Sequence, residues 1–202
     1  MTCRQISSGT SKTLSAVIMA SGCSRRFGEN KLLYPVGGMP MAERLFCVMP
    51  ADLFKKIIVV SKYDEILTMS EKYGYIPIRN DDLTDDIAKT ISLGIGAMDH
   101  LDDGCMFLTS DQPWLTAATI QRLAGEFHNS PEKIHIPVCL GQSGNPVIFP
   151  RRFFEDLRTL PSHHSGKCLV KQYPDAVSYL VVADPLELKD VDTKKDLPST
   201  SI

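Results

Sequence analysis

The chain has 202 residues, 43% of them hydrophobic and 23% charged, which is ordinary for one globular domain with a substantial core. Its formal net charge of -2 and pI near 6.2 give no general attraction to nucleic acid or anionic membranes, so an anion site must be a local basic cluster. The cysteines are scattered without a C-x-x-C pair, and no apolar run approaches the roughly 20 residues of a membrane span. We expect a single cytoplasmic domain at 14–197, with tails at 1–13 and 198–202.

The stretch from Leu14 to Lys31, LSAVIMASGCSRRFGENK, joins a predicted strand to a cationic loop. Leu14–Ala20 is apolar with β-branched residues at its centre, which predicts a buried strand. A glycine-containing loop with three cations follows it directly. Such a loop at the carboxyl end of a strand brings backbone N–H groups and positive charge together. The stretch therefore predicts a cradle for a nucleotide triphosphate.

Strand and helix patterns then alternate along the chain. Apolar runs predict strands, and apolar residues at helical spacing predict helices between them. The expected strands are 56–61, 75–78, 105–109, 134–139, 147–149, 177–182 and 186–191. The expected helices are 40–49, 64–73, 87–100, one after a capping Thr116, 152–157 and 168–172. This order favours a three-layer α/β/α sandwich with a mainly parallel sheet and a small antiparallel portion.

The residues of the cationic loop each suit a phosphate ligand. Gly22 and Gly28 let the backbone approach closely, Ser24 can donate a hydrogen bond, and Arg26 and Lys31 supply positive charge. The loop lacks the G-x-x-x-x-G-K-[ST] pattern of a P-loop and the G-x-G-x-x-G pattern of a dinucleotide fold. The sequence therefore predicts neither a P-loop nor a dinucleotide-binding loop.

Residues 19–31, MASGCSRRFGENK, resemble the signature L-A-A-G-x-S-x-R-M-G-x-x-K of the MobA-like nucleotidyltransferases, which include the molybdenum cofactor guanylyl- and cytidylyltransferases. Three later motifs resemble family motifs in the same order. Asp111-Gln112-Pro113 is similar to D-Q-P, Gly144-Asn145-Pro146 is similar to G-N-P, and residues 190–197 are similar to D-I-D-T-P-E-D-L. The resemblance covers residues 14–197.

The resemblance implies a Rossmann-like enzyme that transfers a nucleotide from an NTP to a phosphorylated acceptor and releases pyrophosphate. No R-P-G-P-L-A-G-like guanine segment stands near residue 80, which favours CTP and a molybdenum cofactor cytidylyltransferase. The implied acceptor is the terminal phosphate of a molybdopterin-type molecule, and a molybdenum hydroxylase apoenzyme is an implied partner. No nucleic acid or membrane partner is implied.

The resemblance also assigns roles to single residues. The implied catalytic residues are Lys31, Arg26 and Asp111. The implied nucleotide-binding residues are Ala20, Ser21, Gly22, Ser24, Gly28, Lys31, Asn80 and Thr90. The implied acceptor-binding residues are Asn145 and Lys167, and the implied ligands of Mg²⁺ are Asp111, Asp190 and Asp192.

Two segments depart from the family pattern and leave the function open. Residues 84–90 and 162–167 differ from the family segments that resemble G-M-S-S-S-L and G-D-x-G-A-R. The same chemistry could serve a sugar phosphate or methylerythritol phosphate as acceptor. A different interpretation is a non-catalytic accessory protein that binds the nucleotide or cofactor for a molybdenum hydroxylase.

Several of these residues also have simpler interpretations. Asp111 can cap the following turn, the Gly144-Asn145-Pro146 segment can be only a turn, and Asp190 and Asp192 can be surface carboxylates. Cys23 falls at a variable position of the signature. We interpret it as a bystander thiol, although its cationic loop is the kind of environment in which thiols become reactive.

Overall fold

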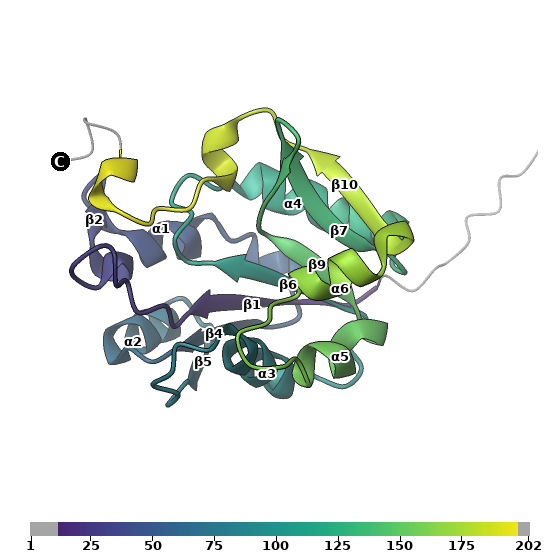
Figure 1. The fold of residues 1–202 in the computed structure, drawn as a ribbon, viewed down its shortest axis with the longest axis horizontal. Coiled ribbons are helices and arrows are strands. Elements are labelled where there is room, and N and C mark those ends of the chain that lie inside the picture. Colours follow the sequence, from purple (N-terminus) through teal and green to yellow (C-terminus); the bar gives the residue numbers. More distant parts are fainter. Residues whose placement is uncertain (1–11, 198–202) are drawn as a thin grey trace, which may run out of the picture.

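The computed structural model describes residues 12–197, and eight strands in this range form one mixed sheet (Figure 1). The sheet order is β10–β7–β9–β6–β1–β4–β5, with β8 paired to β7. These strands are β1 Leu14–Ala20, β4 Ile57–Ser61, β5 Ile76–Arg79, β6 Gly104–Thr109, β7 Ile134–Cys139, β8 Gln142–Ser143, β9 Val147–Pro150 and β10 Val177–Val181. A separate hairpin pairs β2 Pro35–Val36 with β3 Met39–Pro40.

Helices cover both faces of the sheet. One face packs against α1 Met41–Val48, α2 Asp64–Lys72 and α4 Ala117–Asn129, and the other against α3 Ile87–Ala97, α5 Phe154–Arg158 and α6 Lys167–Gln172. The alternation of β1 explains the two layers, because Ala16 and Ile18 point into the first core and Val17 into the second. Figure 1 shows α3 and α5 together on one side of β1 and α4 on the other. The predicted three-layer sandwich is confirmed.

The direction of the strands positions the site. β1 lies at the centre, parallel to β4 and β6, and β4 is parallel to β5. β9 runs antiparallel between β6 and β7, and it supplies the predicted antiparallel portion. The carboxyl ends of β1, β4, β5 and β6 therefore meet at one edge of the sheet, which is where open α/β sheets bind ligands.

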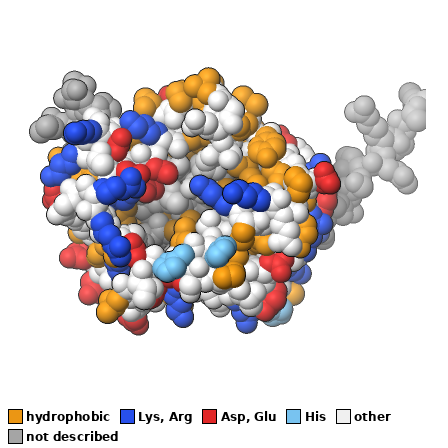
Figure 2. All heavy atoms as spheres, in the orientation of Figure 1, with side chains coloured by type: hydrophobic (Ala, Val, Ile, Leu, Met, Phe, Trp, Pro, Cys, Tyr) orange, Lys and Arg blue, Asp and Glu red, His pale blue; other side chains and the backbone are white. Residues whose placement is uncertain are grey.

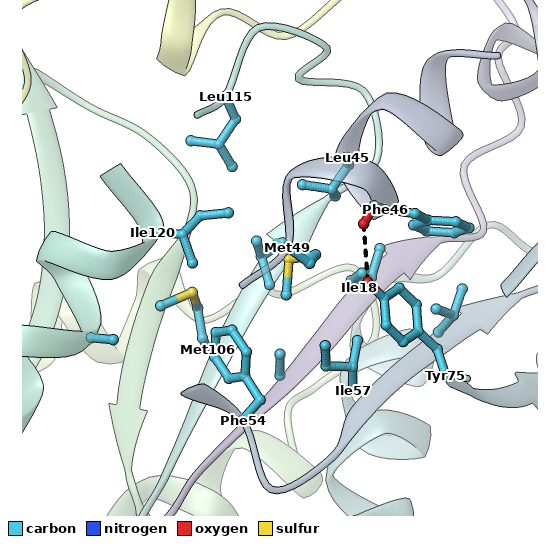
Figure 3. Packing of buried hydrophobic residues seen from close by; sticks show 14 of the residues in the cluster. Ile18, Leu45, Phe46, Met49, Phe54, Ile57, Tyr75, Met106, Leu115 and Ile120 are labelled. Atoms are coloured by element: carbon cyan, nitrogen blue, oxygen red, sulfur yellow. Dashed lines mark hydrogen bonds between the residues drawn. The ribbon is translucent and has the colours of Figure 1, made fainter. Parts of the chain in front are cut away.

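The first core joins α1 to the edge of the sheet (Figure 3). The Tyr75 hydroxyl donates a 3.0 Å hydrogen bond to the backbone oxygen of Phe46, and the two rings meet edge to face with centroids 5.7 Å apart. A buried tyrosine needs a hydrogen-bond partner for its hydroxyl. This contact therefore lets the ring fill the core without leaving a buried hydroxyl unpaired.

The helix starts follow the capping residues in the sequence. The Asp86 carboxylate accepts from Ala88 N at 2.9 Å, and the Thr116 hydroxyl accepts from Thr119 N at 3.2 Å. These contacts satisfy N–H groups that the first turn of a helix leaves without a partner. The predicted cap at Thr116 is confirmed.

The predicted strand at 186–191 is wrong. Pro185–Leu188 forms a 3-10 helix, and the Asp184 carboxylate caps it by accepting from Leu186 N at 2.9 Å. Proline suits the first position of such a turn because its fixed φ is already helical and its missing N–H needs no partner. The chain then extends alongside the loop after β6, where Val191 N donates to Asp111 O at 2.9 Å.

The two predicted tails lie almost wholly outside the described residues, at 1–11 and 198–202. The part of the first tail that is described is tied to the domain, because the backbone of Thr13 accepts from Asp103 N and Gly104 N. Across 12–197, no helix combines the length and the apolar character needed to cross a membrane.

Two glycines of α3 give a matched test of the packing. A Cβ on Gly94 would lie 2.5 Å from Val17 Cγ1, whereas a Cβ on Gly96 would meet nothing within 4 Å. We expect Gly94→Ala to lower the free energy of unfolding by about 1–3 kcal/mol through overpacking. Gly96→Ala should raise it by about 0.5–1 kcal/mol through helix propensity. Urea unfolding of both variants measures this, and equal effects would contradict the close approach of α3 to β1.

Candidate active site

The loop after β1 folds back so that Lys31 points into the site. Ser24 and Gly28 take left-handed conformations, with φ of 53° and 87°. The Ser24 hydroxyl accepts from Lys31 N at 3.1 Å, and the Asn30 side chain accepts from Leu32 N at 3.1 Å. These contacts start a short 3-10 helix at Lys31–Leu33 and set the direction of the lysine. Gly28 suits its turn because a side chain at this φ would be strained.

Lys31 is the charged group around which the site is built. Its Nζ donates to Asp111 Oδ2 at 2.8 Å, to Val191 O at 2.9 Å and to Asp192 Oδ1 at 3.4 Å. Burial by itself lowers the pKa of Lys31, but Asp111 and then Asp192 raise it more, so the net shift is upward. Arg26 forms a second ion pair with Asp192, at 2.8 Å. The three predicted catalytic residues are therefore brought together.

The carboxyl end of β6 holds the C-terminal segment in place. Gln112 is buried, and its Nε2 donates to Leu188 O at 3.1 Å. Together with the Val191 N to Asp111 O bond, this contact places Asp190 and Asp192 beside the loop after β6. The resemblance to D-Q-P thus corresponds to a physical role for the glutamine, which is to tie down the segment that carries two more carboxylates.

The carboxyl of Asp190 lies close to those of Asp111 and Asp192, and its pKa is raised. Burial of its carboxyl, followed by repulsion from Asp111 and Asp192, raises the pKa of Asp190 to about 6. The residue as a whole is exposed, so solvent screens part of this effect. Asp111 Oδ1 is buried and has no hydrogen-bond partner within the described chain. The site holds more negative charge than its own cations neutralise.

A first cavity of about 290 Å³ opens where these residues meet. Figure 2 shows acidic and basic side chains around a hollow on this face. Most of the predicted nucleotide-side and metal residues line it, namely Ser21, Gly22, Ser24, Arg26, Lys31, Asn80, Thr90, Asp111 and Asp192. Inside it, Asn80 Nδ2 donates to Thr90 Oγ1 at 3.1 Å, which joins the end of β5 to α3.

Two predicted nucleotide-binding residues do not line this cavity. Ala20 is buried in β1, where its backbone oxygen accepts from the Ser61 hydroxyl at 2.8 Å. Gly28 lies in the outer part of the loop and supplies its turn. Both residues shape the loop rather than face the cavity.

A second cavity, of about 280 Å³, lies beside the first and is more apolar. It is lined by the three remaining predicted residues, Asn145, Lys167 and Asp190, together with side chains of the second core. Met19, Ile87 and Thr109 line both cavities, so the two lie side by side across these residues. Sequence reasoning missed these three dividing residues because an apolar side chain or threonine at a strand or helix end has the pattern of an ordinary core position.

The loop at 161–166 closes the second cavity. His163 N donates to Asp86 Oδ1 at 2.8 Å, and this bond, together with that from Ala88 N, lowers the pKa of Asp86. Gly166 lies against Phe149, where an added Cβ would be 2.7 Å from the ring. The carboxylate that caps α3 therefore also fixes the loop that leads to Lys167.

A family model described as a MobA-like NTP transferase domain matches residues 16–177. The chain belongs to this family. The resemblance seen in the sequence is confirmed, and the chain is a nucleotidyltransferase-type domain. Its two cavities meet at the carboxyl edge of the sheet, with the signature loop on one side and the Gly144-Asn145-Pro146 segment on the other.

Named relatives share most of the length of this MobA-like chain. It is 29% identical to a probable molybdenum cofactor guanylyltransferase from Pyrococcus horikoshii, over 91% of this chain and 97% of the relative. It is 24% identical to the purine catabolism protein PucB from Bacillus subtilis, over 91% and 93% of the two chains. The first of these relatives is named for guanylyl transfer, whereas the name of the second specifies no nucleotide.

Solved structures share the fold. The crystal structure of Rv0371c from Mycobacterium tuberculosis superposes with a TM-score of 0.76 at 22% identity, over 93% of this chain and 96% of that one. A second structure of Rv0371c, in complex with manganese, has a TM-score of 0.72 at 20% identity, over 93% and 96%. A protein with this fold is therefore observed in complex with manganese.

The raised pKa of Asp190 predicts a pH-dependent cost to stability in metal-free buffer. Its folded value near 6 lies above the ordinary 3.8, so stability is lost as the pH rises from about 4 to about 6. Above pH 6, we expect the free energy of unfolding of Asp190→Asn to exceed that of the wild type by at most about 1 kcal/mol, because the residue is partly solvated. Thermal unfolding in EDTA at a series of pH values measures this. A gap that does not grow between pH 4 and 6 would contradict the crowding of carboxylates.

Proposed function

We propose that the protein transfers a nucleotide, CMP from CTP, to the terminal phosphate of a molybdopterin-type acceptor and releases pyrophosphate. The observation that carries this proposal is the meeting of Lys31, Asp111 and Asp192 in the first cavity, directly beside a second cavity that shares part of its lining. One cavity has the size and the polar loop for a nucleotide, and the other has apolar walls with a lysine at its rim. A phosphorylated acceptor in the second cavity would face a nucleotide in the first.

The side chains supply charge and position rather than a covalent intermediate. Lys31 and Arg26 would move from their carboxylate partners to the phosphates, where they offset the charge that builds on the leaving pyrophosphate. Backbone N–H groups around Gly22 would hold the same phosphates. An acceptor phosphate would then attack the α-phosphorus in line, with both reactants already oriented.

The residues present fit a divalent metal that is completed by its substrate. In the described range, no group of three or more histidine, cysteine or acidic side chains forms a closed metal site. Mg²⁺, however, is usually bound by one or two carboxylates together with substrate phosphates and water. Asp111, with its unpartnered Oδ1, and Asp190 or Asp192 are the side chains that would hold it. When bound, the ion would offset the negative charge of the triphosphate.

The identity of the nucleotide and the identity of the acceptor depend on the residues around the two cavities. The absence of a guanine-type segment near residue 80 supports CTP, whereas the names of relatives support GTP. Apolar side chains in the lining of the second cavity, including Ile91 and Phe107, suit the ring system of a pterin, and Lys167 suits its phosphate. A molybdenum hydroxylase apoenzyme would then be the recipient of the product.

The central test is pyrophosphate release with Mg²⁺, a molybdopterin-type acceptor and each NTP in turn. We expect turnover to be fastest with CTP. Lys31→Ala and Asp111→Asn should each lower kcat by at least about 100-fold, since each removes a charge aimed at the reacting phosphates. Lys12→Ala serves as the control, because Lys12 pairs with Asp103 at the opposite ends of the strands.

Each result of this test has a distinct meaning. Normal turnover in Lys31→Ala and Asp111→Asn would refute the site. Faster turnover with GTP would refute the nucleotide preference alone, and turnover only with a sugar phosphate or methylerythritol phosphate would refute the acceptor. Retention of the cofactor without turnover of any NTP would favour the accessory-protein interpretation.

The acceptor side has its own matched pair of lysines on α6. Lys167 lines the second cavity, whereas Lys171 is exposed on the same helix and does not line it. We expect Lys167→Ala to raise the KM for the acceptor about 10-fold and to leave the KM for CTP unchanged, because a charge-assisted phosphate contact is lost. Lys171→Ala should change neither value. Steady-state kinetics at varied acceptor concentration measures both values. An equal KM for the acceptor in the two variants would contradict a phosphate contact at Lys167.

A further inference from the structure

A cysteine and a lysine that the proposed transfer does not use stand together at the rim of the first cavity. Cys23 is half-buried between Gly22 and Ser24 and lines the cavity. Lys62 follows β4, and its side chain is 17% exposed. Lys62 Nζ lies 2.6 Å from Cys23 Sγ.

The surroundings hold both groups in this arrangement. Asp85 Oδ1 accepts from Cys23 N at 2.9 Å and lies 3.5 Å from Lys62 Nζ. The Tyr63 hydroxyl donates to Gly22 O at 2.9 Å, which pins the loop from the other side. Burial lowers the pKa of Lys62, but its bond to Cys23 and the nearby negative groups raise it more. The contact between amine and sulfur is therefore attractive and fixed by residues from three segments of the chain.

The other cysteines of the described range have different partners. Cys47 Sγ lies 3.1 Å from a tyrosine hydroxyl, and Cys168 donates to a backbone oxygen. Cys105 and Cys139 are buried. Among the cysteines at 12–197, Cys23 alone has a lysine amine within hydrogen-bond distance. This makes it the thiol whose oxidation would have a nearby nitrogen to capture the product.

We infer that Cys23 and Lys62 form a reversible oxidative crosslink in which one oxygen atom bridges the sulfur and the nitrogen. Hydrogen peroxide is the oxidant. A first molecule converts the thiol to a sulfenic acid and leaves as water. A second molecule of hydrogen peroxide accepts two electrons as the sulfenic oxygen bonds to Lys62 Nζ, and this peroxide is reduced to two waters. Lys62 first gives one proton to solvent, which frees the lone pair of its amine. In sum, RSH + R′NH₃⁺ + 2 H₂O₂ gives RS–O–NHR′ + 3 H₂O + H⁺. The S–O and O–N bonds form, the O–O bonds of both peroxides break, and the thiol proton and a second amine proton end in water.

The crosslink would control access to the nucleotide. It ties the loop after β1 to the end of β4 and places the bridge where Cys23 lines the cavity. The neighbouring Gly22 and Ser24 could then no longer adjust around a triphosphate. We expect loss of nucleotide binding on oxidation and protection of Cys23 by bound nucleotide. This consequence rests on the proposed function, whereas formation of the crosslink does not.

The experiment treats the purified full chain with hydrogen peroxide and examines its peptides by mass spectrometry. The expected product is a linked pair of peptides that contain Cys23 and Lys62, about 14 Da heavier than their sum, and dithiothreitol should remove it. Cys23→Ser and Lys62→Arg should not form it, since the arginine keeps the charge but lacks the amine. Cys47→Ser, which removes another accessible thiol, should form it normally.

The outcomes separate this inference from the proposed function. Oxidation of Cys23 without a link, a link that survives in Lys62→Arg, or no oxidation at all would overturn the crosslink. A link that leaves CTP turnover and CTP binding unchanged would overturn its control of the nucleotide. If the reduced protein turns over no NTP, the proposed function fails, and the mass measurement still decides whether the crosslink exists.

Discussion

The site depends on one buried ammonium group. A charged lysine that is 8% exposed costs several kcal/mol unless it is paired and hydrogen-bonded. Lys31 meets this requirement with two carboxylates and one backbone oxygen, which come from the loop after β6 and from the C-terminal segment. Because an unpaired Lys31 would be so costly, its contacts hold together three parts of the chain that are distant in sequence.

The same pairing bears on how the proposed substrates would bind. Lys31 pairs with Asp111 and Arg26 pairs with Asp192, and both carboxylates are ones that the proposed metal would contact. With a metal and a triphosphate, each charged group would have a new partner of opposite sign. Lys31 and Arg26 would thus keep a partner of opposite sign on binding, which avoids the cost of an unpaired buried charge. The unpartnered Oδ1 of Asp111 and the raised pKa of Asp190 are what this arrangement leaves unbalanced.

Much of the fold could be predicted because its strands are buried on both faces and form nearly continuous apolar runs. The segment at 186–191 also contains a run of apolar residues, but Pro185 and the Asp184 cap start a 3-10 helix there. The order of the strands could not be predicted, since β9 enters the sheet between β6 and β7 through pairing that leaves no local pattern.

The candidate site was predictable where a local motif carries it and hidden where it depends on contacts across the chain. The signature loop and Asp111 follow from short patterns around a strand end. Met19, Ile87 and Thr109 look like core residues until the fold shows that they divide two cavities. The nearness of Cys23 and Lys62 was hidden for the same reason, because they follow different strands that only the sheet brings side by side.

The late position of Asp190 and Asp192 in the chain has a consequence for biosynthesis. All strands of the sheet are complete by Val181, and domains tend to fold as the chain emerges from the ribosome. A chain that stopped at this point would contain the whole sheet and the signature loop, with Lys31 missing two of its partners. If the protein has the proposed function, catalytic competence is thus the last property that the growing chain acquires.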